Sequence, residues 1–142
     1  MNANLLVVDA NVLVKLLVEE EFTPQARALF RSHDLLIAPD IAVTEATNAF
    51  VQKVRRGEMS DADARRATVR LPGVIDLRPA SDLLSTALNI ALEFQRSAYD
   101  ALYVALALSE GCKLVTGDRR VINALRHRFG DSLTWIGALP IV

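Results

Sequence analysis

The sequence predicts a layered α/β domain built on a parallel sheet, because short apolar runs alternate with helical patterns along the chain. Five runs have the length and β-branched content of strands, at 5–8, 35–38, 74–77, 113–116 and 133–136. They lack strict alternation, which indicates strands buried on both faces, and strands separated by helices favour parallel pairing. The 142 residues contain no repeat and no Gly/Ser-rich linker, so we expect one domain over residues 1–142.

Capping and turn residues mark the ends of the helices expected between these strands. Thr23 is a helix N-cap candidate and Pro24 suits the first helical position. The next helical pattern starts at Asp40 and stops at Gly57, with basic residues in its last turn. Further helices are expected at 60–71, 81–94, 97–111 and 118–130.

Composition excludes several classes of protein. Apolar residues make up 51% and charged residues 23% of the chain, which is typical of a folded domain and not of a disordered one. The formal net charge is −1, so a polyanionic partner would have to be held by a local basic patch or by a bound cation.

The chain also carries no signal for membrane insertion or for disulfides. The longest uncharged apolar stretch outside the N-terminus is ALYVALAL, far short of the roughly 20 residues that a membrane span needs. The N-terminus lacks the basic flank of a signal peptide. Cys112 is the only cysteine, which fits a reducing compartment, so we expect a cytoplasmic protein.

Four acidic residues stand in apolar surroundings. Asp9 ends the first expected strand, Asp118 follows the fourth, and Glu45 and Asp100 lie in apolar helical segments. Each has a purely structural interpretation. Asp9 and Asp118 could be helix N-caps, Asp100 could form a capping box with Ser97, and Glu45 could lie on a helix surface.

Taken together, the four acids fit a shared site. Ligands of open parallel sheets bind beyond the C-terminal ends of the strands, where the winding direction reverses. Asp9 and Asp118 are at such ends, and Glu45 lies one turn into the helix after the second strand. The helix carrying Asp100 leads into the strand before Asp118, so its first turn can lie over the same edge. A common cluster is therefore geometrically allowed.

Converging carboxylates need compensation, and a divalent cation provides it. Like charges in one pocket raise each other's pKa unless they are protonated or bridged. Lys15 is the one basic residue near these segments, and all-oxygen ligands favour Mg²⁺ or Mn²⁺. Zinc fits poorly, because His33 and His127 lie at polar helix ends and Cys112 follows a turn glycine.

Polar side chains near the acids fit supporting roles. Asn48 lies one helical turn past Glu45 and Gln52 another turn on, while Asn11 follows Asp9. Thr116 precedes Asp118 by two residues. Asn and Thr at strand ends are also common turn and cap residues.

The pattern resembles the PIN-domain nucleases, and most of all the VapC-type toxins of toxin–antitoxin pairs. The stretches that carry the resemblance span nearly the whole chain: VVDANVLVKLL, PDIAVTEATNAF, SAYDALYVALALSEGCKLVTGDRRV and LTWIG. The resemblance implies a three-layer α/β/α fold with a parallel five-stranded sheet. It also implies a metal-dependent endoribonuclease.

The resemblance places Asp9, Glu45, Asp100 and Asp118 on the family's acidic positions and Asn11 and Thr116 on its polar accessory positions. Some relatives carry a further acid just beyond the last aspartate. Here Arg119, Arg120 and Val121 follow instead, which weakens the case for a full second metal site.

The expected mechanism is metal-assisted hydrolysis of an RNA phosphodiester. Mg²⁺ or Mn²⁺ would neutralise the scissile phosphate and lower the pKa of a bound water. Asp9, Asp100 and Asp118 are the expected ligands, and Glu45 is a ligand or orients the water. Both the chemistry and the resemblance favour cleavage that leaves a 5′-phosphate.

Basic residues near the site are candidates for RNA binding. Arg119 and Arg120 adjoin Asp118, while Lys53, Arg55 and Arg56 end the helix of Glu45. Such residues contact phosphates with little sequence choice. A solvated helix face is the alternative explanation for 53–56.

The family resemblance also implies partners. A small antitoxin would mask the site, and the toxin would form a homodimer. Apolar residues of an early helix, such as Phe22, Leu29 and Phe30, could serve that interface or simply pack in the core.

Two other functions remain open from the residues. One is an Mg²⁺-binding phospho-acceptor domain with Asp76 as the acceptor, although the first strand offers only Asp9 and not an acidic pair. The other is a catalytically inactive PIN-like binding module, which the intact set of four acids disfavours.

Overall fold

The computed structural model describes residues 5–32 and 35–141, and a five-stranded sheet forms its centre. The strand order is β3-β2-β1-β4-β5, and every neighbouring pair is parallel. The strands are β1 (Leu5–Val8), β2 (Leu35–Pro39), β3 (Asp76–Arg78), β4 (Lys113–Thr116) and β5 (Leu133–Trp135). The predicted α/β class and the five-stranded parallel sheet are therefore confirmed.

Four predicted strands start where expected, and the third does not. We expected a strand over 74–77, but β3 begins at Asp76. A 3-10 turn at Leu71–Gly73 continues into Val74, whose backbone N–H donates to the Leu71 carbonyl at 3.2 Å. Val74 is thereby held in a turn and cannot join the sheet.

The helices begin close to the predicted residues, but two capping predictions are wrong: Thr23 is the first helical residue, with its hydroxyl accepting the Glu20 N–H, and Asp40 makes no side-chain capping hydrogen bond. They are α1 (Ala10–Leu17), α2 (Thr23–Ser32), α3 (Ile41–Arg55), α4 (Asp61–Arg70), α5 (Leu84–Phe94), α6 (Ala98–Glu110) and α7 (Arg119–Phe129). The segment expected as one helix over 81–94 begins with a 3-10 turn, Ser81–Leu83, before α5. His33 lies outside the described residues.

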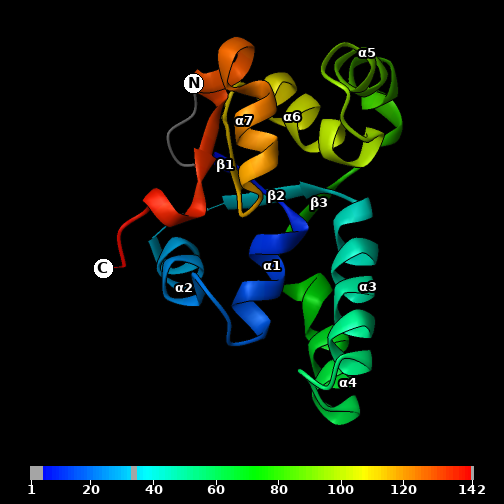
Figure 1. Ribbon diagram of the computed structural model, residues 1–142, viewed down its shortest axis with the longest axis vertical. Helices are drawn as coiled ribbons and strands as arrows, with labels where there is room; N and C mark the ends of the chain where they lie inside the picture. Colours follow the sequence, from blue (N-terminus) through cyan, green and yellow to red (C-terminus); the bar gives the residue numbers. More distant parts are fainter. Residues whose placement is uncertain (1–4, 33–34, 142) are drawn as a thin grey trace.

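The helices cover both faces of the sheet, which makes three layers. Figure 1 shows α1 to α4 on one side of the strands and α5 to α7 on the other. This division follows from the strand order, because right-handed crossovers from β1 to β2 to β3 proceed in one direction along the sheet and those from β3 to β4 to β5 in the other.

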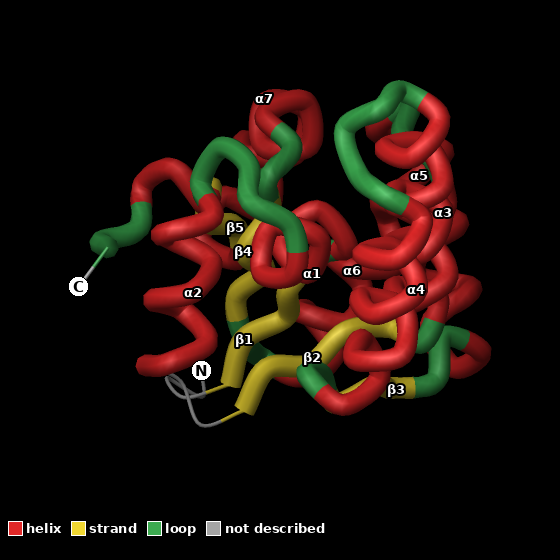
Figure 2. The backbone as a smooth tube through the Cα atoms, turned by 90° about the horizontal axis from the view of Figure 1, so that it is seen from below, coloured by secondary structure: helices red, strands yellow, loops and turns green. Residues whose placement is uncertain are grey.

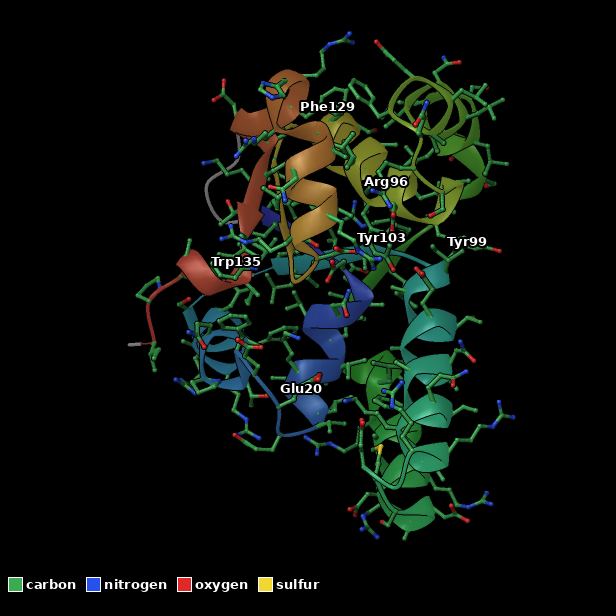
Figure 3. The ribbon with its side chains drawn as sticks, in the orientation of Figure 1. Glu20, Arg96, Tyr99, Tyr103, Phe129 and Trp135 are labelled. Carbon is green, nitrogen blue, oxygen red and sulfur yellow. The ribbon has the colours of Figure 1, made fainter. Side chains whose placement is uncertain are left out.

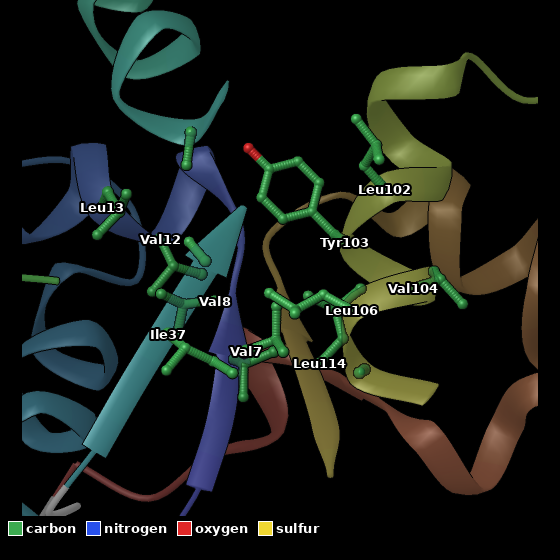
Figure 4. Close-up of a cluster of buried hydrophobic side chains, with 14 of the residues drawn as sticks. Val7, Val8, Val12, Leu13, Ile37, Leu102, Tyr103, Val104, Leu106 and Leu114 are labelled. Carbon is green, nitrogen blue, oxygen red and sulfur yellow. The ribbon is translucent and has the colours of Figure 1, made fainter. Parts of the chain in front are cut away.

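The interior is centred on β1 and α6. Residues 101–107 of α6 are all buried, and this helix packs against β1, β2, β4 and α5. Figure 4 shows Leu106 of α6 close to Val7 and Leu114 of the sheet. A helix that is apolar on nearly all sides is stable only when covered in this way.

The chain reverses its winding direction between β1 and β4. From β1 it adds β2 and then β3 on one side, and then returns to place β4 on the other side of β1. Figure 2 shows β1 between β2 and β4. The C-terminal ends of β1 and β4 therefore form the switch point where ligands of such sheets bind. No helix within the described ranges is long and apolar enough to cross a membrane.

Candidate functional site

A small cavity of about 40 Å³ lies at this switch point. Its lining includes all four acids singled out from the sequence, and each comes from a different part of the fold. The lining residues are Asp9, Ala10, Asn11, Glu45, Asp100, Tyr103, Leu114, Thr116, Asp118 and Val121. The volume suffices for a cation with one or two water molecules.

Asp9 is both a helix cap and a wall of the cavity. Its Oδ1 accepts a hydrogen bond from the Val12 backbone N–H at 3.0 Å, as expected of an N-cap, and its Oδ2 accepts one from the Thr116 hydroxyl. Burial raises the pKa of Asp9 from 3.8 to about 6, although the Thr116 and Val12 hydrogen bonds oppose that rise. The structural and the functional interpretation of Asp9 are therefore compatible.

Asp118, at the end of β4, likewise caps a helix and lines the cavity. It caps α7 by accepting the Arg120 backbone N–H at 2.9 Å. Its own N–H donates to Thr116 Oγ1 at 3.0 Å. Thr116 therefore ties the two strand-end aspartates together.

Asp100 enters the cavity from the first turn of α6. Ser97 caps this helix by accepting the Asp100 backbone N–H at 3.1 Å. Burial raises the pKa of Asp100; the neighbouring Arg96 opposes that rise, and the charge of Asp118 adds to it. Asp100 and Asp118 are thus close enough for their charges to interact.

Arg96 is a site residue that the sequence alone did not single out. Its Nε lies 3.5 Å from Asp100 Oδ2, an ion-pair distance without good hydrogen-bond geometry. Gln95 adopts a left-handed conformation (φ 56°) at the end of α5, which turns the chain so that Arg96 sits beside the start of α6 (Figure 3). Arg96 precedes the N-cap Ser97 and lies outside both α5 and α6, so helical spacing gave no signal for it.

Tyr103 is a second residue that sequence reasoning missed. Its hydroxyl donates a hydrogen bond of 2.6 Å to Glu45 Oε1, which joins α6 to α3. Burial raises the pKa of Glu45, and burial together with the Glu45 charge raises the pKa of Tyr103. Tyr103 follows Asp100 by three residues on the same face of α6, and that spacing was its signal in the sequence.

The supporting residues divide into two groups. Asn11 and Thr116 line the cavity, as expected. Asn48 and Gln52 do not, and both side chains are exposed, so a supporting role for Asn48 is not what the structure indicates. The reason is helical phase: the buried face of α3 is formed by residues four apart (Ala42, Ala46 and Phe50), and it leaves Asn48 on the solvent side.

The basic residues differ in their surroundings. The Arg119 guanidinium lies over the Trp135 ring, 3.8 Å from its centroid, while Arg120 Nε lies 3.4 Å from Asp118 Oδ1. Lys53 pairs with Glu20 at 3.1 Å instead of pointing outward. Arg120 is thus the predicted RNA-binding residue nearest the acids.

The other two basic residues of α3 lie away from the cavity. Arg56 pairs with Glu58 at 3.1 Å, and Arg55 lines a separate groove between α3 and α4. Neither is part of the cavity lining.

The phospho-acceptor alternative finds no support in the position of Asp76. This residue begins the edge strand β3, where it pairs with Arg78 at 3.2 Å. It is exposed and does not line the cavity at the switch point.

The cavity offers oxygen ligands only, which is the donor set that Mg²⁺ and Mn²⁺ prefer. Within residues 5–32 and 35–141, no three His, Cys, Asp or Glu side chains are placed to hold one ion as they stand. Ion binding would therefore require the carboxylates to rotate toward one another. Burial raises the pKa of Asp9, Glu45 and Asp100, and neighbouring carboxylates add to the rise for Glu45 and Asp100, so a bound cation would favour their charged forms.

Comparison with known proteins agrees with this architecture. The PIN domain family matches residues 6–126. The chain belongs to the PIN-domain family. Ribonuclease VapC3 of Pyrobaculum aerophilum is 33% identical over 119 residues, which cover 82% of this chain and 91% of that protein. Ribonuclease VapC9 of Mycobacterium tuberculosis is 32% identical over 118 residues, covering 82% and 88%. The resemblance to VapC-type PIN domains is thus confirmed.

Solved structures show the same PIN fold. PAE2754 from Pyrobaculum aerophilum superposes with a TM-score of 0.65 at 24% identity, covering 93% of this chain and 90% of that one. VapC20 of Mycobacterium tuberculosis, a toxin that cleaves the sarcin-ricin loop, superposes with a TM-score of 0.62 at 20% identity, covering 84% and 94%. At 24% and 20% identity, these similarities show a shared fold and nothing further.

Proposed function

We propose that this PIN-domain protein is a metal-dependent endoribonuclease and the toxin of a VapBC-like toxin–antitoxin system. The observation that carries the proposal is the convergence of four carboxylates, from four separate elements, on one cavity at the switch point. The ribonuclease names of its VapC relatives support the same activity. Mg²⁺ or Mn²⁺ is the proposed cofactor because the donors are all oxygen.

The residues have distinct proposed roles. Asp9, Asp100 and Asp118 would hold the ion, which when bound would neutralise the scissile phosphate and acidify a water molecule. Thr116 fixes the positions of Asp9 and Asp118 relative to each other, because its hydroxyl hydrogen-bonds to both residues. Glu45, half-buried in the cavity lining, would orient the attacking water.

Cations at the rim would receive the RNA backbone. Arg120 is 81% exposed beside Asp118, and Arg96 lies beside Asp100. The chain as a whole has a net charge of −1, so these local cations and the metal would supply the attraction for phosphate. Arg119 would contact the RNA backbone only after its guanidinium leaves the Trp135 ring. If it stays on the ring, its role is to hold Trp135 in place.

The remaining features of the proposal rest on the VapC resemblance. A small VapB-type antitoxin would bind the toxin and mask the cavity. A homodimer and a cytoplasmic location are part of the same proposal.

A cleavage assay tests the proposed activity. Purified protein would be incubated with a structured RNA pool and Mg²⁺ or Mn²⁺, with EDTA as the metal-free arm. We expect cleavage by the wild type that EDTA and Asp100→Asn both abolish. Asp82→Asn is the matched control, because Asp82 is exposed and lies outside the cavity. Cleavage that persists in folded Asp100→Asn would contradict the assigned site.

A further inference from the structure

The hydrogen bond between Tyr103 and Glu45 joins a rigid group to a flexible one. The Tyr103 side chain is 4% exposed in the packed interior of α6, and Figure 4 shows its hydroxyl directed away from α6 toward α1. Glu45 is only half-buried, on α3. A glutamate has three rotatable side-chain bonds, so a fixed partner decides where its carboxylate lies.

Tyr103 is that partner. Its hydroxyl donates to Glu45 Oε1 at 2.6 Å, which is a short, charge-assisted hydrogen bond. Glu45 takes part in no ion pair among the residues that the structure describes.

The contact leaves Glu45 with one engaged and one available oxygen. Because Oε1 accepts the hydrogen bond from the Tyr103 hydroxyl, Oε2 is the atom left to act on a ligand in the cavity. A carboxylate held by one oxygen is poorly suited to chelate an ion with both, but well suited to accept a proton from a water molecule.

We infer that Tyr103 is a positioning residue that fixes the Glu45 carboxylate, so that Glu45 presents Oε2 to the cavity and orients the attacking water. This inference rests on the proposed ribonuclease function. It assigns Glu45 to the water and not to bidentate metal binding. Outer partners of this kind commonly matter nearly as much as the groups they orient.

Tyr103→Phe removes the hydroxyl and keeps the ring. We expect kcat for RNA cleavage to fall by about tenfold to 100-fold, with KM within about twofold of the wild type. The variant should remain folded at the assay temperature by circular dichroism, because the ring still fills its place in the core. Tyr99→Phe, on the exposed side of the same helix, is the matched control and should retain full activity.

A spectroscopic measurement tests the contact separately from catalysis. The chain has two tyrosines, so Tyr99→Phe leaves Tyr103 as the only one. The tyrosine doublet in ultraviolet resonance Raman spectra reports whether the hydroxyl donates to a strong acceptor. We expect the donor signature in Tyr99→Phe and its loss when Glu45→Ala is added.

The outcomes separate the two proposals. Wild-type protein that cleaves no RNA with either metal would overturn the proposed function and, with it, this role of Tyr103. An active wild type with an equally active Tyr103→Phe would overturn the positioning role alone. A tyrosine doublet that is unchanged by Glu45→Ala would also overturn the positioning role. So would a Tyr103→Phe variant whose KM rises while its kcat stays unchanged.

Discussion

Thr116 and Asp9 are joined by a hydrogen bond that crosses from β4 to the end of β1. The Thr116 hydroxyl donates to Asp9 Oδ2 and accepts the Asp118 backbone N–H at 3.0 Å. Both Thr116 and Asp9 are buried. One hydroxyl thereby sets the relative positions of the two strand-end carboxylates, and its removal would affect both.

Thr116→Val tests this arrangement, because valine has nearly the same shape but no hydroxyl. We expect the free energy of unfolding to fall by about 1–3 kcal/mol, since a buried carboxylate loses a donor. Metal-dependent cleavage should fall as well. Urea denaturation and the RNA assay measure the two effects. Thr116→Ser keeps the hydroxyl and should retain activity; a Thr116→Val variant as stable and as active as the wild type would show that the hydrogen bond does not matter.

Stability of the metal-free protein should decrease as pH rises through the titration of Asp9. The pKa of Asp9 is about 6 in the folded state against 3.8 for the free group, so the native protein keeps a proton that the unfolded chain releases. The stabilisation is complete below about pH 4 and lost above about pH 6, and the difference is about 3 kcal/mol. Asp9→Asn should flatten this profile.

Urea denaturation in EDTA, repeated from about pH 4 to pH 8, measures the effect. Asp76→Asn, an exposed carboxylate on β3, is the control and should leave the profile unchanged. A wild-type profile that matches that of Asp9→Asn would contradict the role of Asp9 burial.

Divalent ions should stabilise the folded protein through the same carboxylates. At an ion concentration about 100 times the dissociation constant, the expected gain is about 2.7 kcal/mol. Thermal unfolding with Mn²⁺ and with EDTA measures this gain. Asp100→Asn should abolish it while leaving the metal-free protein folded, because the substitution removes a repelling charge. A full gain in Asp100→Asn would place the ion elsewhere.

Gly137 should be intolerant of any side chain. A Cβ at this position would lie 2.4 Å from Trp135 Cη2, and the Trp135 ring also contacts Phe22 and Arg119. We expect Gly137→Ala to lower the free energy of unfolding by about 1–3 kcal/mol through overpacking. Gly73→Ala meets nothing within 4 Å and is the control in the same denaturation experiment. Equal stability of both variants would show that the Trp135 ring moves freely.

The sequence by itself determined the order of the strands and helices, and the edge of the sheet at which Asp9 and Asp118 lie. Alternating strand and helix patterns require a parallel sheet, and a parallel sheet gathers its strand ends at one edge. Asp9 and Asp118 could therefore be assigned to that edge from their place after apolar runs. These conclusions depend on local periodicity, which the chain carries in every segment.

Tertiary structure decided which side chains touch. The Tyr103–Glu45 and Arg96–Asp100 contacts depend on how α6 packs over β1 and on the turn at Gln95. The exposure of Asn48 depends on which side of α3 faces the core. Rotation of a helix by a fraction of a turn changes such contacts without changing its sequence pattern, because periodicity specifies an apolar face and leaves the partners of polar groups to packing.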